Sequence, residues 1–343
     1  MITHAASSSS SGPEMIWKCP KCRGSLFEEA PAIRCSVCAA AFPVLDGIPD
    51  FRISGPSWID FETDRAYAKR LLHEMKENPP EAWVRRIFSD QRPADKARIE
   101  LRTRQVMMGP DRLRSELAGW LRRPTSSAGL FLEIGCGAGT LLAGAAAAAG
   151  RQGIGIDASI AWLLVAARLV RARGGEPILA AALAEALPLG NAAMTGVISL
   201  DVIEHVTDPR IYLREIDRVL ASGGSVALST PNRYSLGAEP HVFVWGVGWL
   251  PRRWQKAYVR WRSGKPYDFV RLLSYRELRS LLRSETRLDA EIIAPPIPDE
   301  EASLFSPRRA LLAGVYNRLV SCRGWQSLFR RVGPFFRVVG RKY

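Results

Sequence analysis

Residues 130–142 read LFLEIGCGAGTLL, and this stretch decides the fold class that the sequence predicts. Apolar residues run up to Glu133, then Gly135, Gly137 and Gly139 alternate with other residues, and a helix-forming run of Leu and Ala follows. This order of residue types predicts a buried strand, a tight turn and a helix. Because glycine has no side chain, such a turn lets backbone N–H groups approach a bound ligand closely.

The alternating glycines do not match the fingerprint of dinucleotide-binding proteins. That fingerprint, G-x-G-x-x-G, would need a third glycine at position 140, which is Thr140. The pattern present, E-x-G-x-G-x-G, resembles motif I of the class I S-adenosylmethionine (SAM) methyltransferases, whose glycines let the backbone approach the methionine part of SAM. The resemblance implies a SAM site that includes Glu133, Gly135, Cys136, Gly137 and Gly139.

A second predicted strand, RQGIGIDAS, ends at Asp157. A carboxylate at the end of such a strand can accept hydrogen bonds from both ribose hydroxyls of a nucleotide. Downstream, AALAEALPLGNAAMTGVISLDVIEHVTDP resembles the family's run from motif II through the fourth strand, which adds Ala158, Leu183, Ala184, Glu185 and Asp201 to the implied SAM site.

Leu183 departs from the family, in which an acidic residue at this position holds the adenine amino group. Glu185, or backbone groups around Ala184, can take over that contact.

Strands and helices alternate over residues 128–232, which predicts an α/β fold with a Rossmann-like, doubly wound parallel sheet. A ligand is expected beyond the carboxyl ends of its strands. RLDAEIIAP and GPFFRVVGRKY read as the last two strands of the seven that the resemblance implies, the second of them antiparallel. The methyltransferase domain is expected over residues 126–343, with insertions at about 233–270 and 299–332.

The fourth strand ends in LDVIEHV, which places Asp201, Glu204 and His205 beside the expected methyl group. The imidazole of His205 suits the removal of a proton from a hydroxyl or phenol, or else it is a structural residue that orients the loop. The D-x-x-E-H pattern also resembles the site of ubiquinone-pathway O-methyltransferases, whose matching residues bind a divalent cation that positions a catechol. The resemblance thereby implies a Mg²⁺ site at Asp201, Glu204 and His205.

A metal site is also predicted near the N-terminus, within residues 15–53. Cys19 and Cys22 form one CxxC pair and Cys35 and Cys38 a second, with twelve residues between the pairs. Free thiols or a redox CxxC would not explain the doubling, whereas four thiolates at this spacing predict a closed, structural zinc site. The stretch through FPVLDGIPDF resembles the zinc ribbon of the Trm112-like family, in which such ribbons occur as methyltransferase partners or fused in front of methyltransferase domains. Residues 54–125 are patterned as linking helices.

The composition is that of a globular protein, with 343 residues of which 47% are hydrophobic and 24% charged. Residues 1–14 are small and polar without a signal-peptide core, so we expect a disordered tail. The apolar runs are shorter than the ~18 residues of a membrane-spanning helix. These features, with cysteines spaced for metal, predict a cytoplasmic protein.

The basic residues are concentrated in the C-terminal part of the chain. The formal net charge is +14, and residues 241–343 hold 20 Lys and Arg against 8 Asp and Glu. In LPRRWQKAYVRWRSGK, helical spacing places Leu250, Trp254, Ala257, Tyr258 and Trp261 on one face with arginines beside it. This face is expected to cap the acceptor pocket, to bind peripherally at the inner face of the membrane, or to contact RNA. His241 in EPHVFVWG is expected to contact substrate or to be structural.

The function expected from these features is SAM-dependent O-methylation of a small-molecule or lipid- or glycan-linked metabolite. The sequence contains no N-P-P-[YF] motif and no Pro-Cys pair at the end of the fourth strand, which disfavours adenine-N6 and cytosine-C5 methylation of nucleic acid. An rRNA-type methyltransferase is one alternative, because one kind of rRNA guanine methyltransferase carries a zinc module before its SAM domain. A degenerate SAM-binding partner protein, suggested by Leu183, is the other.

Overall fold

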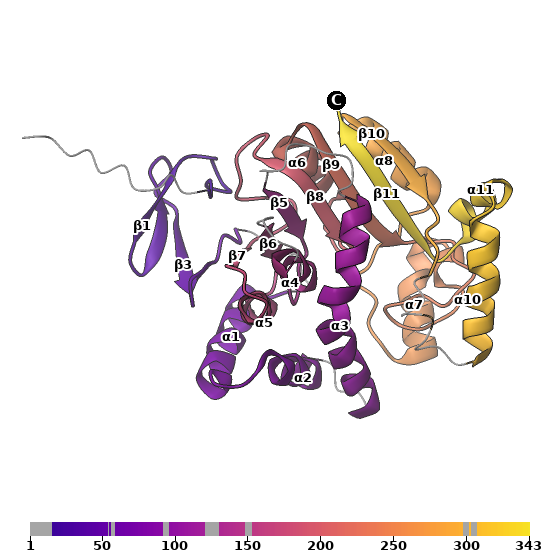
Figure 1. Ribbon diagram of the computed structural model, residues 1–343, viewed down its shortest axis with the longest axis horizontal. Helices are drawn as coiled ribbons and strands as arrows, with labels where there is room; N and C mark the ends of the chain where they lie inside the picture. Colours follow the sequence, from indigo (N-terminus) through magenta and orange to yellow (C-terminus); the bar gives the residue numbers. More distant parts are fainter. Residues whose placement is uncertain are drawn as a thin grey trace, which may run out of the picture.

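Within the described residues, seven strands form the central sheet of the protein (Figure 1). The computed structural model describes residues 16–53, 55, 59–91, 96–120, 130–147, 153–297, 302 and 307–343. The expected N-terminal tail, residues 1–14, lies outside them.

The strand order of the sheet is β10-β11-β9-β8-β5-β6-β7. Five neighbouring strands run parallel to one another: β9, β8, β5, β6 and β7. β11 is antiparallel to both of its neighbours, as the sequence predicts. The strand order reverses between β5 and β8, which opens a crevice at their carboxyl ends. The predicted α/β, Rossmann-like fold is confirmed. The strands are β5 (Phe131–Ile134), β6 (Gly153–Asp157), β7 (Ile178–Ala181), β8 (Met194–Leu200), β9 (Leu220–Pro231), β10 (Leu288–Ile293) and β11 (Phe335–Lys342).

Helices cover both faces of this sheet. On one face, α4 (Thr140–Ala147) and α5 (Ile160–Ala172) share a buried apolar cluster with α1 and α2. On the other face, α6 (Pro209–Val219) and α8 (Tyr275–Glu285) pack together over a second cluster. Local signals set the helix starts: Asp208 caps α6 before Pro209, and Ser274 forms a capping box with Glu277 at the start of α8.

The N-terminal ribbon is a separate antiparallel sheet of four strands within the described residues, in the order β1-β2-β3-β4. Its last turn is a two-residue Asp46-Gly47 hairpin in which both residues have positive φ, the conformation that Asp-Gly favours. The strands are β1 (Leu26–Glu29), β2 (Ala32–Cys35), β3 (Ala41–Leu45) and β4 (Ile48–Pro49).

The ribbon extends the central sheet at its β7 edge. The Phe51 N–H donates to the carbonyl of Ala181 at 2.7 Å, and the Lys18 N–H donates to that of Pro188 at 2.9 Å. The Phe51 ring is fully buried against Trp17 and Phe42, with ring centroids 5.8 and 5.2 Å apart. The edge strand of the sheet is therefore covered by the chain's own N-terminal module.

Three helices connect the ribbon to the sheet: α1 (Phe61–Met75), α2 (Pro80–Gln91) and α3 (Lys96–Trp120). Asp60 caps α1 by accepting the Thr63 N–H, and α2 begins at Pro80, where a missing N–H costs nothing. Trp83 of α2 is fully buried. α1 and α2 pack on α5, while α3 packs on α4, so all three belong to one face of the sheet.

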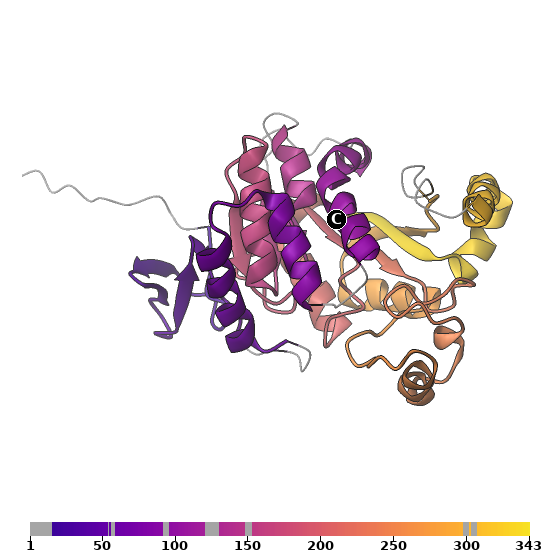
Figure 2. The ribbon, with the colours of Figure 1, turned by 90° about the horizontal axis from the view of Figure 1, so that it is seen from below.

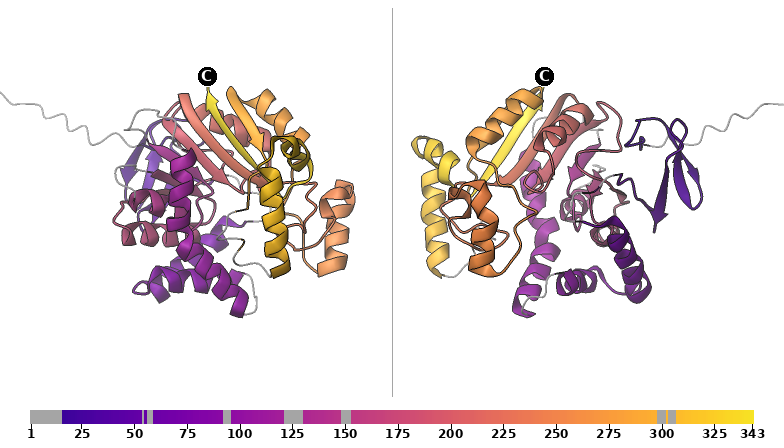
Figure 3. Two further views of the ribbon diagram at one scale, coloured as in Figure 1. Left: turned by 45° about the vertical axis from the view of Figure 1, so that its right-hand side comes forward. Right: turned by 180° about the vertical axis from the view of Figure 1, so that it is seen from behind.

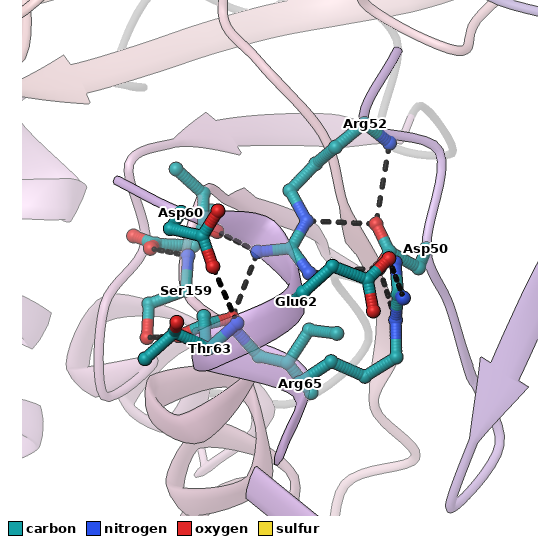
Figure 4. A network of polar contacts seen from close by, with 11 residues as sticks. Asp50, Arg52, Asp60, Glu62, Thr63, Arg65 and Ser159 are labelled. Carbon is teal, nitrogen blue, oxygen red and sulfur yellow. Dashed lines mark hydrogen bonds and ion pairs between the residues drawn. The ribbon is translucent and has the colours of Figure 1, made fainter. Parts of the chain in front are cut away.

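A buried arginine fixes how the ribbon meets the rest of the molecule (Figure 4). The Arg52 guanidinium donates to Asp50 and to Asp64 of α1, and one of its N–H groups donates to the Ala158 carbonyl, each at 2.7 Å. The Arg52 side chain is fully buried and its pKa is raised by these two carboxylates against the opposing effect of burial. A buried charge requires such partners, so the three segments are held in one arrangement.

Asp64 extends this network to the start of α5. It accepts hydrogen bonds from the Ser159 hydroxyl and the Ile160 N–H, both at 2.9 Å. A carboxylate at this end of a helix also interacts favourably with the helix dipole. The turn that follows Asp157 is thus held by α1 on one side and by the ribbon's end, through Arg52, on the other.

The two C-terminal insertions form the end of the molecule opposite the ribbon (Figures 1 and 2). Residues 233–270 carry the short helix η1 (Val247–Trp249) and α7 (Arg252–Ser263), and residues 299–332 include α10 (Pro307–Val320) and α11 (Arg323–Val332). Figure 3 shows α7, α10 and α11 away from the ribbon in both views. Across the described ranges, no helix combines the length and apolar character needed to cross a membrane.

α7 packs differently from the amphipathic face predicted for it. Val259 and Gln255 are buried, while Trp254 and Trp261 are 54% and 75% exposed. Val259 packs with Val242 and other valines of the preceding loop, so this contact selects which side of the helix is buried.

Replacing Arg52 tests the buried network. Arg52→Met leaves Asp64 without its cation and Asp50 with Arg65 alone, and removing one partner of a buried ion pair costs about 3–5 kcal/mol. We expect a clearly lower free energy of unfolding in denaturant titrations. Arg85→Met is the matched control, because Arg85 pairs with Glu81 and Glu100 on the exposed surface and should change the unfolding midpoint little. Equal effects of the two substitutions would contradict this account.

Candidate active site

A cavity of about 780 Å³ lies at the carboxyl ends of the parallel strands. Its size is within the range of small-molecule and cofactor sites. Its walls come from the ends of β5 and β6, the turns after β7 and β8, the 233–270 insertion and α3. The lining residues are Arg98, Arg102, Ile134, Gly135, Ile156, Asp157, Ala158, Ala182, Leu183, Ala184, Glu185, Asp201, Val202, His205, Val206, His241, Val242, Phe243, Lys265, Pro266 and Phe269.

The glycine loop after β5 needs its glycines for distinct reasons. Gly135 and Gly139 have positive φ, and a Cβ added to them would lie 2.2 Å from Val202 and 2.6 Å from Ala166. Larger residues there would therefore clash as well as strain the backbone. Gly137 also has positive φ, but a Cβ at this position would meet no atom within 4 Å. The loop is packed at both ends and open in the middle.

Asp157 lies at the end of β6, directly beside this loop. One carboxylate oxygen accepts the Gly137 N–H and the other accepts the Ser159 N–H, each at 2.8 Å. These contacts orient the carboxylate while leaving each oxygen further acceptor capacity for ribose hydroxyls. Asp157 thus fits the ribose-binding position that the sequence indicates.

Glu133 in β5 and Cys136 within the glycine loop are both buried. Glu133 is 5% exposed, burial raises its pKa to about 8, and its Oε2 atom has no hydrogen-bond partner among the described residues. A buried polar atom without a partner next to a glycine loop is consistent with a site that is completed by a ligand. The loop, the orphaned oxygen and Asp157 therefore fit SAM.

The turn after β7 brings Leu183, Ala184 and Glu185 to the cavity wall. The Glu185 carboxylate accepts the Thr207 N–H at 2.6 Å. This hydrogen bond holds Glu185 at the wall, two residues from the apolar side chain of Leu183.

The turn after β8 supplies the polar end of the cavity. Asp201 has a φ of 55° and accepts a hydrogen bond from Ser229 at 2.9 Å. Glu204 is 1% exposed, and burial, reinforced by the charge of Asp201, raises its pKa to about 8. One Glu204 oxygen accepts the Thr230 hydroxyl at 2.9 Å, whereas Oε1 has no partner among the described residues.

Two imidazoles meet beside Glu204. The rings of His205 and His241 lie edge to face with centroids 4.8 Å apart. His205 Nδ1 is 2.9 Å from the Phe269 carbonyl, which can only accept, so this nitrogen carries the proton and Nε2 carries the lone pair of the neutral ring. The structure brings together ligand-type atoms of Glu204, His205 and His241, all within 4.8 Å of one another. Asp201, which the sequence groups with them, lines the same cavity.

Some lining residues were not among the sequence candidates. Arg98 and Arg102 come from α3 and Lys265 from the insertion, so three cationic side chains reach the cavity wall. No motif marks them, because they lie on segments that sequence patterns describe only as charged helix or loop. No residue of α7 or α10 is part of the described lining, although the apolar face of α7 was expected to cap this pocket.

The four ribbon cysteines have the geometry of a zinc site. The sulfur atoms of Cys19 and Cys38 are 3.6 Å apart and those of Cys22 and Cys35 are 3.4 Å apart, with all four within 4.8 Å of one another. Tetrahedral zinc with Zn–S bonds of about 2.3 Å needs sulfurs ~3.8 Å apart. The cysteines therefore fit one structural zinc ion.

Comparisons with known proteins show the family of this chain. Residues 132–228 match the family model described as "Methyltransferase domain". A ubiquinone biosynthesis O-methyltransferase of Dinoroseobacter shibae is 33% identical over 186 residues, which cover 54% of this chain and 68% of the relative. The chain belongs to the class I SAM-dependent methyltransferases.

Other relatives of this methyltransferase are also named ubiquinone biosynthesis O-methyltransferase. The Ruegeria sp. ubiquinone biosynthesis O-methyltransferase is 35% identical over 163 residues, 44% of this chain and 66% of the relative. The chain spans about half to two thirds of the length of the curated relatives it matches. Among solved structures, phosphoethanolamine N-methyltransferase 2 of Haemonchus contortus in complex with SAM is 18% identical, with a TM-score of 0.46 over 76% of this chain and 60% of that one.

The role given to Asp157 can be measured directly. Asp157→Asn removes the charge and one acceptor oxygen, and hydrogen bonds to charged groups contribute about 1.5–3 kcal/mol. SAM affinity in isothermal titration should fall by about 10- to 100-fold. Asp208→Asn, at an α6 cap outside the described cavity lining, is the matched control and should bind SAM as the wild type does. Unchanged affinity in the Asp157 variant would remove Asp157 from the cofactor site.

Proposed function

We propose that this methyltransferase transfers the methyl group of SAM to an oxygen of a small-molecule or lipid- or glycan-linked acceptor. The observation that carries the proposal is the layout of one cavity, with the glycine loop and Asp157 at one wall and two imidazoles at another. The ubiquinone biosynthesis O-methyltransferases named above support the choice of oxygen.

The cofactor half of the cavity would seat SAM in a fixed orientation. Asp157 would accept the ribose hydroxyls, and Gly135, Gly137 and Gly139 would let the backbone approach the methionine part. Glu133 and Cys136 would support this loop, and Ala158, Leu183, Ala184, Glu185 and Asp201 would complete the cofactor contacts. Fixing the sulfonium in this way holds the methyl carbon in line with the acceptor atom, which is the main task of such an enzyme.

The acceptor half would place a hydroxyl near His205. SAM would supply the methyl group, whose transfer to the hydroxyl oxygen would break the carbon–sulfur bond and leave a neutral thioether. The Nε2 lone pair of His205, whose other nitrogen is held by Phe269, would take up the hydroxyl proton. Positioning and proton removal are the two contributions that the chain's own residues make.

A divalent cation at the same turn is the alternative to His205 as the base, because the Nε2 lone pair cannot bind a cation and accept a proton at once. Asp201, Glu204 and His205, the set that family resemblance implies, share one turn after β8, and two carboxylates with one imidazole suit Mg²⁺. Glu204 Oε1 is buried without a partner among the described residues, which is an observation that fits a positively charged ligand. A bound cation would lower the pKa of the acceptor hydroxyl.

The wall chemistry supports an amphiphilic acceptor. Val202, Val206 and Phe269 give apolar contact, whereas Arg98, Arg102 and Lys265 give positive charge at the same cavity. A phenol or sugar hydroxyl attached to an apolar or anionic carrier would match both. Within the described residues, no specific contact favours the RNA-methylating or the degenerate alternative.

The acceptor proposal is tested with a methyl-labelled cofactor. Labelled SAM, the purified chain and separated lipid, polar-metabolite and RNA fractions of a bacterial extract are incubated together. We expect label in the lipid or polar fraction, bound to oxygen.

His205→Gln should reduce the rate by about 10²- to 10⁴-fold while leaving SAM affinity near the wild-type value. His73→Gln, on the exposed side of α1, is the control. Label confined to RNA, or full activity of the His205 variant, would overturn the proposal.

Peripheral membrane contact is proposed for the end formed by the insertions. Exposed apolar side chains recur there, among them Trp254 and Trp261 on α7, Leu311 and Leu312 on α10, and Trp325 on α11. Arginines flank them, as in helices that lie in the headgroup layer of anionic membranes.

Vesicle flotation measures this contact. The chain should float with vesicles that contain phosphatidylglycerol and remain in the dense fraction with phosphatidylcholine alone, and about 0.5 M salt should weaken the binding. Trp254→Ser with Trp261→Ser should reduce flotation, whereas Phe27→Ser, at an exposed site on the ribbon, should not. Equal flotation of both variants would place the contact elsewhere.

A further inference from the structure

The insertion adds a second imidazole to the turn after β8. His241 Nε2 is 4.0 Å from Glu204 Oε1, and this oxygen is buried without a partner among the described residues. His205 and His241 are both loop residues, and each is held in place by a hydrogen bond to a neighbour of its own.

Glu239 fixes the orientation of the His241 ring. The Glu239 carboxylate is 2.5 Å from His241 Nδ1 and also accepts the backbone N–H groups of His241 and Val242. Glu239 is 4% exposed, so the contact is shielded from water. A carboxylate on one nitrogen of an imidazole directs the lone pair of the other nitrogen outward, the arrangement found behind metal-binding histidines.

The orientation of the His205 ring is also fixed by a hydrogen bond, in this case to the C-terminal end of the insertion. Its Nδ1 donates to the Phe269 carbonyl, and the Arg271 N–H donates to the Glu204 carbonyl at 2.7 Å. The C-terminal end of the 233–270 insertion is thus attached to the turn that carries Glu204 and His205. The lone pair of each imidazole is on Nε2, the form required of a metal ligand.

We propose that His241 takes the place of Asp201 in the cation site implied by the resemblance, so that Glu204, His205 and His241 bind a divalent transition-metal cation and Glu239 positions His241. Two imidazoles and one carboxylate favour Fe²⁺, Zn²⁺ or Mn²⁺ over Mg²⁺, which prefers oxygen ligands. Three protein ligands leave coordination positions open toward the cavity.

The site closes around the ion by a small movement. The ligand atoms lie within 4.8 Å of one another, whereas two ligands about 2.1 Å from a common ion lie ~3–3.4 Å apart. A shift of roughly 1 Å in these loop residues brings them into range.

This inference deepens the proposed function: the role of the cation in methyl transfer rests on that function, whereas cation binding does not. When bound, the cation would hold the acceptor oxygen and lower the pKa of its hydroxyl, and His205 would then act as a ligand and not as the base. Cation binding itself is measured without an acceptor, so the two proposals can fail separately.

The experiment titrates MnCl₂ into the full chain with zinc bound to the ribbon. Binding is measured by isothermal titration calorimetry and by the electron paramagnetic resonance signal of free Mn²⁺. Mn²⁺ is chosen because thiolates select zinc over it, so the ribbon does not compete. We expect one Mn²⁺ per chain in the wild type. His241→Ala should weaken binding by at least 10-fold, and Glu239→Gln by about 10- to 100-fold.

Two controls make the outcome decisive. His73→Ala removes an exposed imidazole of α1 and should bind Mn²⁺ as the wild type does. Asp201→Asn separates the two ligand sets, because it should keep Mn²⁺ binding if His241 has taken the place of Asp201. The denaturant unfolding midpoint of each variant reports whether the fold is intact, and His241→Gln replaces His241→Ala if the latter does not fold. No Mn²⁺ binding by the wild type, or equal binding by the His241 variant, overturns the inference. Loss of binding in Asp201→Asn but not in the His241 variant would do the same.

Discussion

The charge of Arg52 has to be compensated where water cannot reach it. Asp50 at the end of the ribbon, Asp64 on α1 and the Ala158 carbonyl after β6 provide that compensation. Moving any one of these groups would take a partner away from the buried guanidinium, which is expensive. The position of the ribbon, the first helix and the turn after Asp157 are therefore one coupled arrangement, and the cofactor wall of the cavity depends on it.

The two halves of the cavity have different structural origins. The cofactor half is made from the ends of neighbouring parallel strands, whose positions are set by the sheet. The acceptor half is made from the turn after β8 and from a long insertion, which are joined by hydrogen bonds at Phe269 and Arg271. The sheet can thus hold SAM in one way, while the insertion is placed where it can select the acceptor.

The sequence predicted the fold well because its signals are local. The glycine alternation, the position of Asp157 and the strand–helix order each depend on residues close together in the chain, and the CxxC pairs carry their own spacing rule. The contact of Glu239 and His241 with the turn at Glu204 could not be predicted, since no periodicity links an insertion to a distant loop. Arg52 and Ala158, 106 positions apart, pose the same problem. For α7, helical spacing indicated an apolar face, but the neighbouring valines determined which side is buried.

The hydrogen bond from Phe51 to Ala181 joins two modules of a single polypeptide. Because the chain links the two modules covalently, their docking is an intramolecular event, with an effective concentration in the millimolar range for short linkers. Contacts too weak to hold a free subunit at cellular concentrations are then enough to keep the ribbon in place. Dilution cannot separate the two, so the supply of ribbon and of catalytic domain is always one to one.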